Sequence, residues 1–184
     1  MKLLFVRHGK SLANADDIVG TPDTPLAEEG IEQARVTGQD LRSQNVTALV
    51  CSSFIRAQQT AEIIAGEVGV PIADITVVDE LRERRMGELE GHPKRHETAF
   101  FFENNTALGF ESQAALIERM SRALQRVKEI AAKTAGTTVV VGHATSGFYL
   151  LQVAKGHTKF EDFEPVNEMN NAEFVEIETG ENSD

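Results

Sequence analysis

The fold is decided by the stretch Leu3-Leu4-Phe5-Val6-Arg7-His8-Gly9, in which an apolar run of strand length passes directly into charged and flexible residues. Such a run predicts a buried β-strand. A second stretch repeats the arrangement, where Val139-Val140-Val141-Gly142 leads into His143. Ligands of open α/β sheets collect at the carboxyl ends of parallel strands. We therefore expect both imidazoles in one crevice at the edge of a sheet.

Apolar strand candidates alternate with helical periodicity along the chain, which is typical of βαβ units and a mostly parallel sheet. The predicted strands cover residues 2–6, 48–51, 75–78, 137–141 and 172–177. The predicted helices cover residues 27–42, 56–68 and 112–135, with a further helical segment at 146–153. The sequence thus predicts an α/β fold, a single three-layer domain over residues 1–178. The acidic tail at 179–184 is expected to be disordered.

Helical spacing also predicts which helix faces are buried. On the first helix these are Ile31, Ala34, Gly38 and Leu41, and on the longest helix Leu116, Met120, Leu124, Val127 and Ala131. Two segments, 15–25 and 86–110, resist regular assignment and have the length of functional loops. In the second, Phe100-Phe101-Phe102 predicts either a pocket lining or lid, or an amphipathic helix packed on the sheet edge.

Composition limits the function classes. The 184 residues are 41% hydrophobic, which suits one globular domain. The formal charge of −11 argues against nucleic acid or an anionic membrane as partner, because both are bound through Lys and Arg contacts to phosphate. We find neither a membrane-length apolar run nor a signal peptide, which predicts a cytoplasmic protein. The single Cys51 excludes an internal disulfide and is predicted to be an inert, half-buried thiol.

Basic residues fall into two groups. Arg7 and Arg56 lie at strand-to-helix junctions, where a guanidinium can meet a bound anion. Most of the basic residues between 84 and 95 are interpreted as a solvated face, because Glu88 and Glu90 are interleaved with them. A small anionic substrate therefore stays compatible with the negative net charge, since its binding depends on the local field.

An ordered series of motifs extends over most of the chain. It comprises Arg7-His8-Gly9-Lys10-Ser11-Leu12-Ala13-Asn14, Gly20 with Asp23 and Pro25-Leu26, Gly30 with Gln33-Ala34, Ser52 to Ala61, Leu81-Arg82-Glu83, Gly87 with Glu90-Gly91, Gly109-Phe110-Glu111-Ser112, and Val141-Gly142-His143. The series resembles the histidine phosphatase superfamily, which includes the cofactor-dependent phosphoglycerate mutases. This resemblance implies a phosphoglycerate mutase-like fold.

The resemblance also implies catalytic roles. His8 would attack phosphorus and become a phosphohistidine, for which its ring must be neutral. A backbone carbonyl that accepts the proton of one ring nitrogen would aim the other nitrogen at the substrate. Arg7, Arg56 and His143 match the phosphate pocket, and Glu83 matches the acid that protonates the leaving group and later activates water. The other interpretation of Glu83 is a surface partner of a neighbouring arginine.

The substrate-binding residues that the resemblance implies are Asn14, Ser11, Lys10, Gly20 and Thr21. The chain departs from the family pattern at three places. Lys10 stands where Glu or Gln is common, Ala144-Thr145 replaces two glycines after the second histidine, and Leu89 replaces an aromatic residue. Lys10 would add a cation at the mouth of the pocket.

Together these features predict a phosphomonoester hydrolase that needs neither metal nor cofactor and acts on a small phosphorylated metabolite. A phosphoglycerate mutase is the alternative, although mutases of the family usually carry an insertion for which 184 residues leave little room. A non-catalytic phospholigand-binding protein is an alternative of another class, but binding alone requires neither His8 nor Glu83. The oligomeric state stays open, a homodimer being one option.

Other chemistries fit the residues less well. A thiol phosphatase loop has five residues between its cysteine and arginine, whereas four separate Cys51 from Arg56. A metal site made by His8, His143 and Glu83 is disfavoured because the neighbouring arginines would oppose a cation. The chain also contains no G-x-x-x-x-G-K-S/T loop that would hold a nucleotide.

Overall fold

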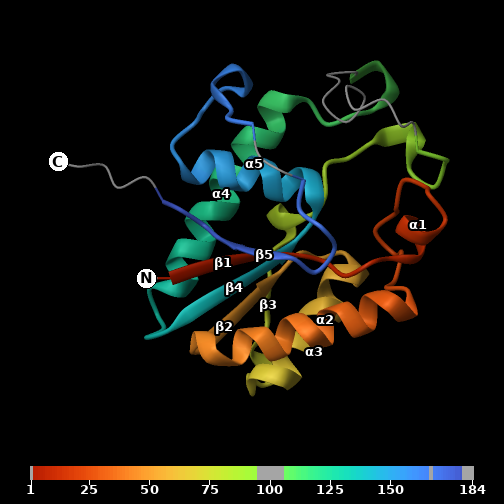
Figure 1. The fold of residues 1–184 in the computed structure, drawn as a ribbon. Coiled ribbons are helices and arrows are strands. Elements are labelled where there is room, and N and C mark those ends of the chain that lie inside the picture. Colours follow the sequence, from red (N-terminus) through yellow and green to blue (C-terminus); the bar gives the residue numbers. More distant parts are fainter. Residues whose placement is uncertain (1, 95–105, 166–167, 180–184) are drawn as a thin grey trace.

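The computed structural model describes residues 2–94, 106–165 and 168–179 (Figure 1). Within these ranges one five-stranded sheet has the order β3-β2-β4-β1-β5. The strands are β1 (Lys2–Arg7), β2 (Val46–Cys51), β3 (Thr76–Val77), β4 (Thr137–Gly142) and β5 (Phe174–Glu176). The first four strands pair with one another in parallel, and β5 runs antiparallel to β1. The predicted α/β fold with a mostly parallel sheet is therefore confirmed.

Helices cover both faces of this sheet. They are α1 (Leu12–Ala15), α2 (Glu28–Leu41), α3 (Ile55–Val68), α4 (Gln113–Ala131) and α5 (Ala144–Ala154). Figure 1 shows α2 and α3 on one side of the sheet and α4 and α5 on the other. Short 3₁₀ turns are found at Arg42–Gln44, Ile72–Asp74, Asp79–Leu81, Gly87–Leu89, Thr106–Leu108 and Phe160–Asp162.

Strand β1 explains why its sequence reads as a continuous apolar run. Successive side chains of a strand point to opposite faces. Leu3 and Phe5 belong to the core on the α4 and α5 side, whereas Leu4 and Val6 belong to the core on the α2 and α3 side. Both faces of β1 are thus buried, and its carboxyl end meets the loops of the site described below.

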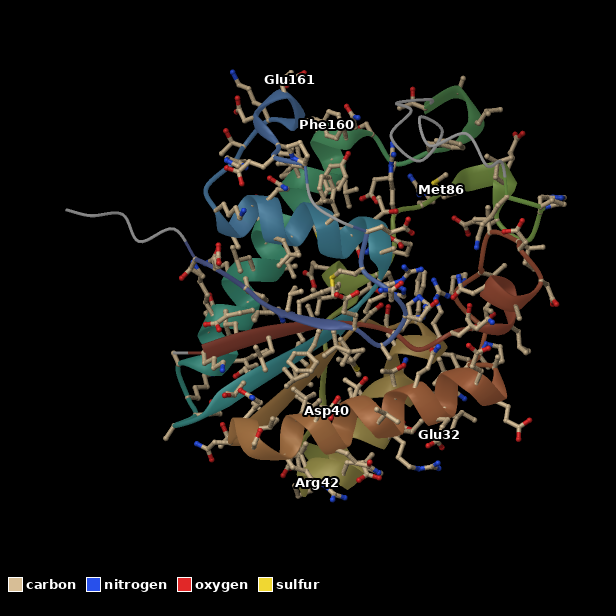
Figure 2. The ribbon with its side chains drawn as sticks, viewed as in Figure 1. Glu32, Asp40, Arg42, Met86, Phe160 and Glu161 are labelled. Carbon is tan, nitrogen blue, oxygen red and sulfur yellow. The ribbon has the colours of Figure 1, made fainter. Side chains whose placement is uncertain are left out.

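The buried helix faces follow the predictions with one exception. The five residues of the α4 stripe are all buried, as are Ala34, Gly38 and Leu41 of α2. Ile31 was predicted to face inward but is 40% exposed. Gly30 takes the inward position instead, because a Cβ there would lie 2.0 Å from the Lys10 carbonyl oxygen. The polar side of α2 faces solvent, where Glu32 and Asp40 are exposed (Figure 2).

Two further expectations need correction. Arg84 was assigned to a solvated face but is 2% exposed, because its Nε donates to the Glu111 carbonyl at 2.9 Å. Cys51 is fully buried rather than half-buried, and this burial raises the pKa of its thiol to about 12, which agrees with an inert thiol.

The structure also shifts some helix boundaries. Helix α4 ends at Ala131 rather than at residue 135, and α5 begins at Ala144 rather than at residue 146. The predictions for Phe100-Phe101-Phe102 and for most of the tail at 179–184 lie outside the described residues. None of the helices in the described ranges has the length and apolar character needed to cross a membrane.

Candidate active site

The two histidines lie together at the carboxyl ends of adjacent parallel strands. Arg7 of β1 is paired with Gly142 of β4, so that His8 and His143 follow at the same level. Their ring centroids are 5.1 Å apart, with an angle of 65° between the ring planes. His8 is 5% exposed and His143 is fully buried. The expected meeting of the two imidazoles at this edge of the sheet is confirmed.

The ring of His8 presents one nitrogen as an acceptor. Its Nδ1 lies 2.7 Å from the Gly9 carbonyl oxygen, which can only accept, so Nδ1 carries the proton. Its Nε2 then holds a lone pair and accepts the Nε–H of Arg56 at 3.2 Å. Burial, followed by the charge of Arg56, lowers the pKa of His8 well below its ordinary value. The ring is therefore neutral at neutral pH, with the lone pair of Nε2 directed at Arg56.

Arg56 is held by the loop that precedes α2. Its Nη1 donates to the Thr21 carbonyl at 2.8 Å, and its guanidinium lies 5.0 Å from the centroid of the Phe54 ring. A Cβ on Gly20 would lie 3.5 Å from the same Nη1, so Gly20 and Thr21 together line one side of this guanidinium. Burial lowers the pKa of Arg56 to about 10, so the guanidinium stays charged at neutral pH.

Ser52 fixes the second imidazole. Its Oγ lies 2.8 Å from His143 Nε2 and accepts the N–H of Phe54 at 3.2 Å. A buried hydroxyl needs an acceptor for its own proton, and in the described part of the chain His143 Nε2 is the acceptor within reach. Nε2 therefore accepts and Nδ1 carries the proton, because burial and then Arg56 lower the pKa of His143 well below its ordinary value. Ser52 was missed as a site residue, although it opens the motif block 52–61.

Two buried donors near this crevice have no protein partner among the described residues, namely Nδ1 of His143 and Nε of Arg7. Arg7 is anchored elsewhere, since its Nη1 donates to the Met169 carbonyl and lies 3.7 Å from Glu168 Oε1. Burial lowers the pKa of Arg7, and the charges of Glu83 and Glu168 partly offset this. Unpaired buried donors are rare in native proteins. Donors on adjacent strands suit the oxygens of one anionic group.

Glu83 lies at the amino end of α5. Its carboxylate accepts the N–H groups of Thr145 at 3.1 Å, Ser146 at 2.8 Å and Arg84 at 2.8 Å. Its negative charge acts on both Arg7 and Arg56. The other interpretation was a surface pair of Glu83 with Arg82 or Arg85. Arg82 pairs instead with Asp79 at 2.7 Å.

Of the residues implied to bind substrate, Asn14 and Ser11 lie near His8, whereas Lys10 pairs with a residue of α2. Asn14 lies beside His8, because Asn171 Nδ2 donates to the His8 carbonyl at 3.0 Å and to Asn14 Oδ1 at 3.4 Å. Ser11 caps α1 and exchanges hydrogen bonds with Asn14. Lys10 is not brought to the histidines, since its Nζ lies 2.7 Å from Glu29 on α2.

Lys94 was assigned to a solvated face but is half-buried. Its Nζ lies 3.8 Å from Asp17 Oδ1, and its charge contributes to the field at His8. Nothing in the local sequence distinguishes Lys94 from its exposed neighbours.

Among the described residues no group of three His, Cys, Asp or Glu side chains could hold a metal ion.

Buried guanidinium groups, two neutral imidazoles and a carboxylate at one sheet edge define a site that can bind an anionic group and exchange a proton with it. Residues 3–183 match the model of the histidine phosphatase superfamily (branch 1). The chain belongs to this superfamily, as its motifs indicated.

Relatives within the superfamily carry different activities in their names. Probable phosphoglycerate mutase GpmB of Yersinia pestis is 43% identical over 96 residues, which cover 50% of this chain and 42% of that protein. The match thus spans less than half the length of these curated relatives. A mycobacterial glucosyl-3-phosphoglycerate phosphatase in complex with VO3 is 21% identical, with a TM-score of 0.81 over 95% of this chain and 90% of its own.

A third similar protein comes from Escherichia coli K-12 and is named as a candidate alpha-ribazole-5'-P phosphatase. It is 28% identical, with a TM-score of 0.69 over 85% of this chain and 80% of its own. The phosphoglycerate mutase-like fold that the motifs implied is confirmed by these structural similarities.

Proposed function

We propose that this chain is a phosphomonoester hydrolase that works through a phosphohistidine on His8. The observation that carries the proposal is the state of His8, a buried neutral ring whose Nδ1–H is bound by Gly9 and whose Nε2 faces Arg56. In the first step, Nε2 would form a bond to phosphorus while the bond from phosphorus to the ester oxygen breaks. Glu83 would first take up the proton that a monoanionic ester carries on its phosphate, and would pass this proton to the leaving oxygen.

The transferring phosphoryl group spreads negative charge over its three equatorial oxygens. Nε of Arg7, Nδ1 of His143 and the guanidinium of Arg56 are the donors that would meet these oxygens. Such donors act strongly in a site from which water is excluded. The planar guanidinium suits paired oxygens in a way that a lysine ammonium does not.

In the second step, water would attack the phosphohistidine. Glu83, now a carboxylate, would take a proton from that water, and the bond between phosphorus and His8 Nε2 would break to release inorganic phosphate. The proton balance closes when Glu83 passes this proton to the released phosphate and is again a carboxylate. His8 returns to its neutral state with Nδ1–H still on the Gly9 carbonyl.

A small phosphorylated metabolite is the proposed substrate. The cations of the site attract a compact anion locally, whereas the net charge of −11 repels polyanions such as nucleic acid and anionic membranes. A cytoplasmic location and independence of metal and cofactor belong to the same proposal. The ester group itself is left open.

Phosphoglycerate mutase is the second candidate, because the name of the curated Yersinia relatives favours it. The two activities separate when the protein is incubated with 2- and 3-phosphoglycerate and with p-nitrophenyl phosphate. The hydrolase proposal expects phosphate release from an ester, loss of that release in His8→Ala, and no effect of a chelator. Interconversion of the phosphoglycerates faster than phosphate release from either would overturn it. Phosphate binding without any turnover would favour the non-catalytic alternative.

A further inference from the structure

A buried ion pair lies behind Glu83 and takes no part in the chemistry described above. Arg119 of α4 meets Glu111 through two parallel contacts, Nε to Oε1 at 2.7 Å and Nη2 to Oε2 at 2.5 Å. The two side chains are 3% and 10% exposed. Burial alone would raise the pKa of Glu111, but the hydrogen bonds and charge of Arg119 lower it overall, so the pair is ionised.

Arg119 also holds the backbone that carries Glu83. Its Nη1 donates to the carbonyls of Glu80 at 2.6 Å and Arg82 at 2.8 Å, and its Nη2 reaches the carbonyl of Glu83 at 3.4 Å. One guanidinium thus fixes the segment 80–83 from the side of α4. These contacts join residues that are 36 to 39 positions apart in the chain.

Glu111 holds the other flank of Glu83. The carbonyl of Glu111 accepts from Arg84 Nε at 2.9 Å, and its backbone N–H donates to the Arg85 carbonyl at 2.9 Å. The ends of the segment around Glu83 are therefore bound to the same ion pair. The carboxylate of Glu83 is left to reach the amino end of α5.

A contribution to folding stability explains poorly why a buried ion pair is present at this position. Replacing a buried ion pair by well-packed apolar residues is often neutral or stabilising, because desolvation of both charges opposes their attraction. The guanidinium fork does supply a fixed geometry for several acceptors at once, which a lysine ammonium lacks. Geometry is therefore the stronger reason for the pair.

We propose that Arg119 and Glu111 form a positioning pair that holds Glu83 in place for proton transfer to the leaving group. This inference rests on the proposed hydrolase activity. No hydrogen bond of the pair reaches the histidines in the described structure, although the charge of Arg119 acts on His143. Arg119→Lys keeps that charge and removes the guanidinium geometry, so this variant isolates the effect of the pair on Glu83. Misplacement of Glu83 matters most when the leaving group needs a proton.

The test compares two aryl esters of similar shape, phenyl phosphate and p-nitrophenyl phosphate. Phenolate is the poorer leaving group and depends more on the acid, whereas p-nitrophenolate departs readily as an anion. The measured quantity is the ratio of the two kcat/KM values within one preparation. This ratio is independent of the concentration of folded enzyme, so partial unfolding of a variant cannot produce a change. The parameter kcat/KM also excludes the shared hydrolysis of the phosphoenzyme when transfer to His8 is irreversible.

The variants are Arg119→Lys, with Glu83→Gln as the reference and Arg122→Lys as the matched control on the same helix. Arg122 pairs with Glu118 at 2.7 Å on the solvent side, where both side chains are more than half exposed. We expect Arg119→Lys to lower kcat/KM for phenyl phosphate about tenfold more than for p-nitrophenyl phosphate. Glu83→Gln should shift the ratio in the same direction and further, and Arg122→Lys should leave it unchanged.

Equal losses on both esters in Arg119→Lys would overturn the positioning role while leaving the hydrolase proposal intact. A ratio that does not move in Glu83→Gln would remove the acid role of Glu83 and the inference with it. Absence of phosphate release from both esters by the unsubstituted protein is a different failure, because it contradicts the hydrolase proposal itself.

Discussion

The floor of the site and its rim are built on opposite electrostatic principles. The floor consists of His8, Arg56 and His143, which are at most 5% exposed. We give the name rim to two ion pairs outside this floor, Lys10–Glu29 and Lys94–Asp17, in which the acidic side chains are 60% and 52% exposed. Charges act strongly where water is excluded, whereas exposed pairs are weakened by solvent and salt. We therefore expect substitutions on the floor to change the rate of phosphoryl transfer strongly, and substitutions on the rim to change mainly the choice of ester.

The comparison is tested most severely by Arg56→Lys. The lysine keeps a positive charge but loses the fork that can contact both a phosphoryl oxygen and the Thr21 carbonyl. We expect kcat/KM for p-nitrophenyl phosphate to fall by about 10²- to 10³-fold. Steady-state kinetics with an unfolding control measure this effect. A change of less than threefold would show that charge alone suffices on the floor.

The neutral histidines of the floor also predict how stability depends on pH. Their folded pKa values lie well below the 6.5 of an unfolded histidine, because burial and Arg56 oppose the charged form. Below pH 6.5 the two histidines bind protons in the unfolded chain but not in the native protein. Their contribution to the free energy of unfolding is therefore present above pH 6.5 and is lost as the pH falls. The loss is about 1.4 kcal/mol per pH unit for each histidine.

Urea unfolding between pH 7 and pH 5 measures this slope. His8→Asn should reduce the slope of the free energy of unfolding against pH by about 1.4 kcal/mol per pH unit, since one of the two histidines has been removed. A slope that stays the same in this variant would mean that His8 is charged in the native protein.

Ser52→Ala separates the two imidazoles of the floor. Without the Ser52 hydroxyl, His143 Nε2 loses its donor, and the ring is no longer held with its proton on Nδ1. We expect kcat to fall about tenfold, which corresponds to the loss of roughly one hydrogen bond. Nitrogen NMR of the histidine side chains should show a mixed tautomer for His143. Ser53→Ala is the matched control, because Ser53 Oγ contacts Asp79 outside the floor. Equal effects in both variants would contradict the role of Ser52.

The smallest effect is expected at the rim. Lys10→Ala removes an ammonium that pairs with Glu29 rather than with the histidines. We expect less than a threefold change in kcat/KM for p-nitrophenyl phosphate, in line with the small energies of exposed ion pairs. Measurements at low and high salt check the assignment. A loss approaching that of Arg56→Lys would place Lys10 on the floor and remove the distinction.

The sequence predicted the elements that are buried on both faces better than those at the edges. Strands β1 and β4 were located correctly because their side chains are apolar in an unbroken run. Strand β3 is a two-residue edge strand, shorter than the predicted 75–78, because its single neighbour β2 supplies few backbone partners. Ile31 was misplaced because periodicity alone cannot show that Gly30 must pack against the Lys10 backbone.

Strand ends and the family motifs were the two features of the sequence from which the site could be predicted. His8 and His143 follow apolar runs directly, so their meeting was legible from the sequence. Ser52 and Arg119 act through contacts with residues far along the chain, 91 positions away for Ser52 and His143. The motif block 52–61 includes Ser52 but does not show its contact with His143. A buried arginine on a helix cannot be told from its exposed neighbours by the local sequence. The roles of Ser52 and Arg119 therefore became visible only in the tertiary structure.

The central claim is that His8 carries the phosphoryl group during turnover. The most direct measurement is a rapid-quench single turnover with an ester labelled on phosphorus, followed by mapping of the labelled peptide. We expect an acid-labile label on His8 that forms before free phosphate and decays at the rate of phosphate release, and no label in His8→Ala. Full phosphate release without any label on His8, or turnover retained in His8→Ala, would contradict it.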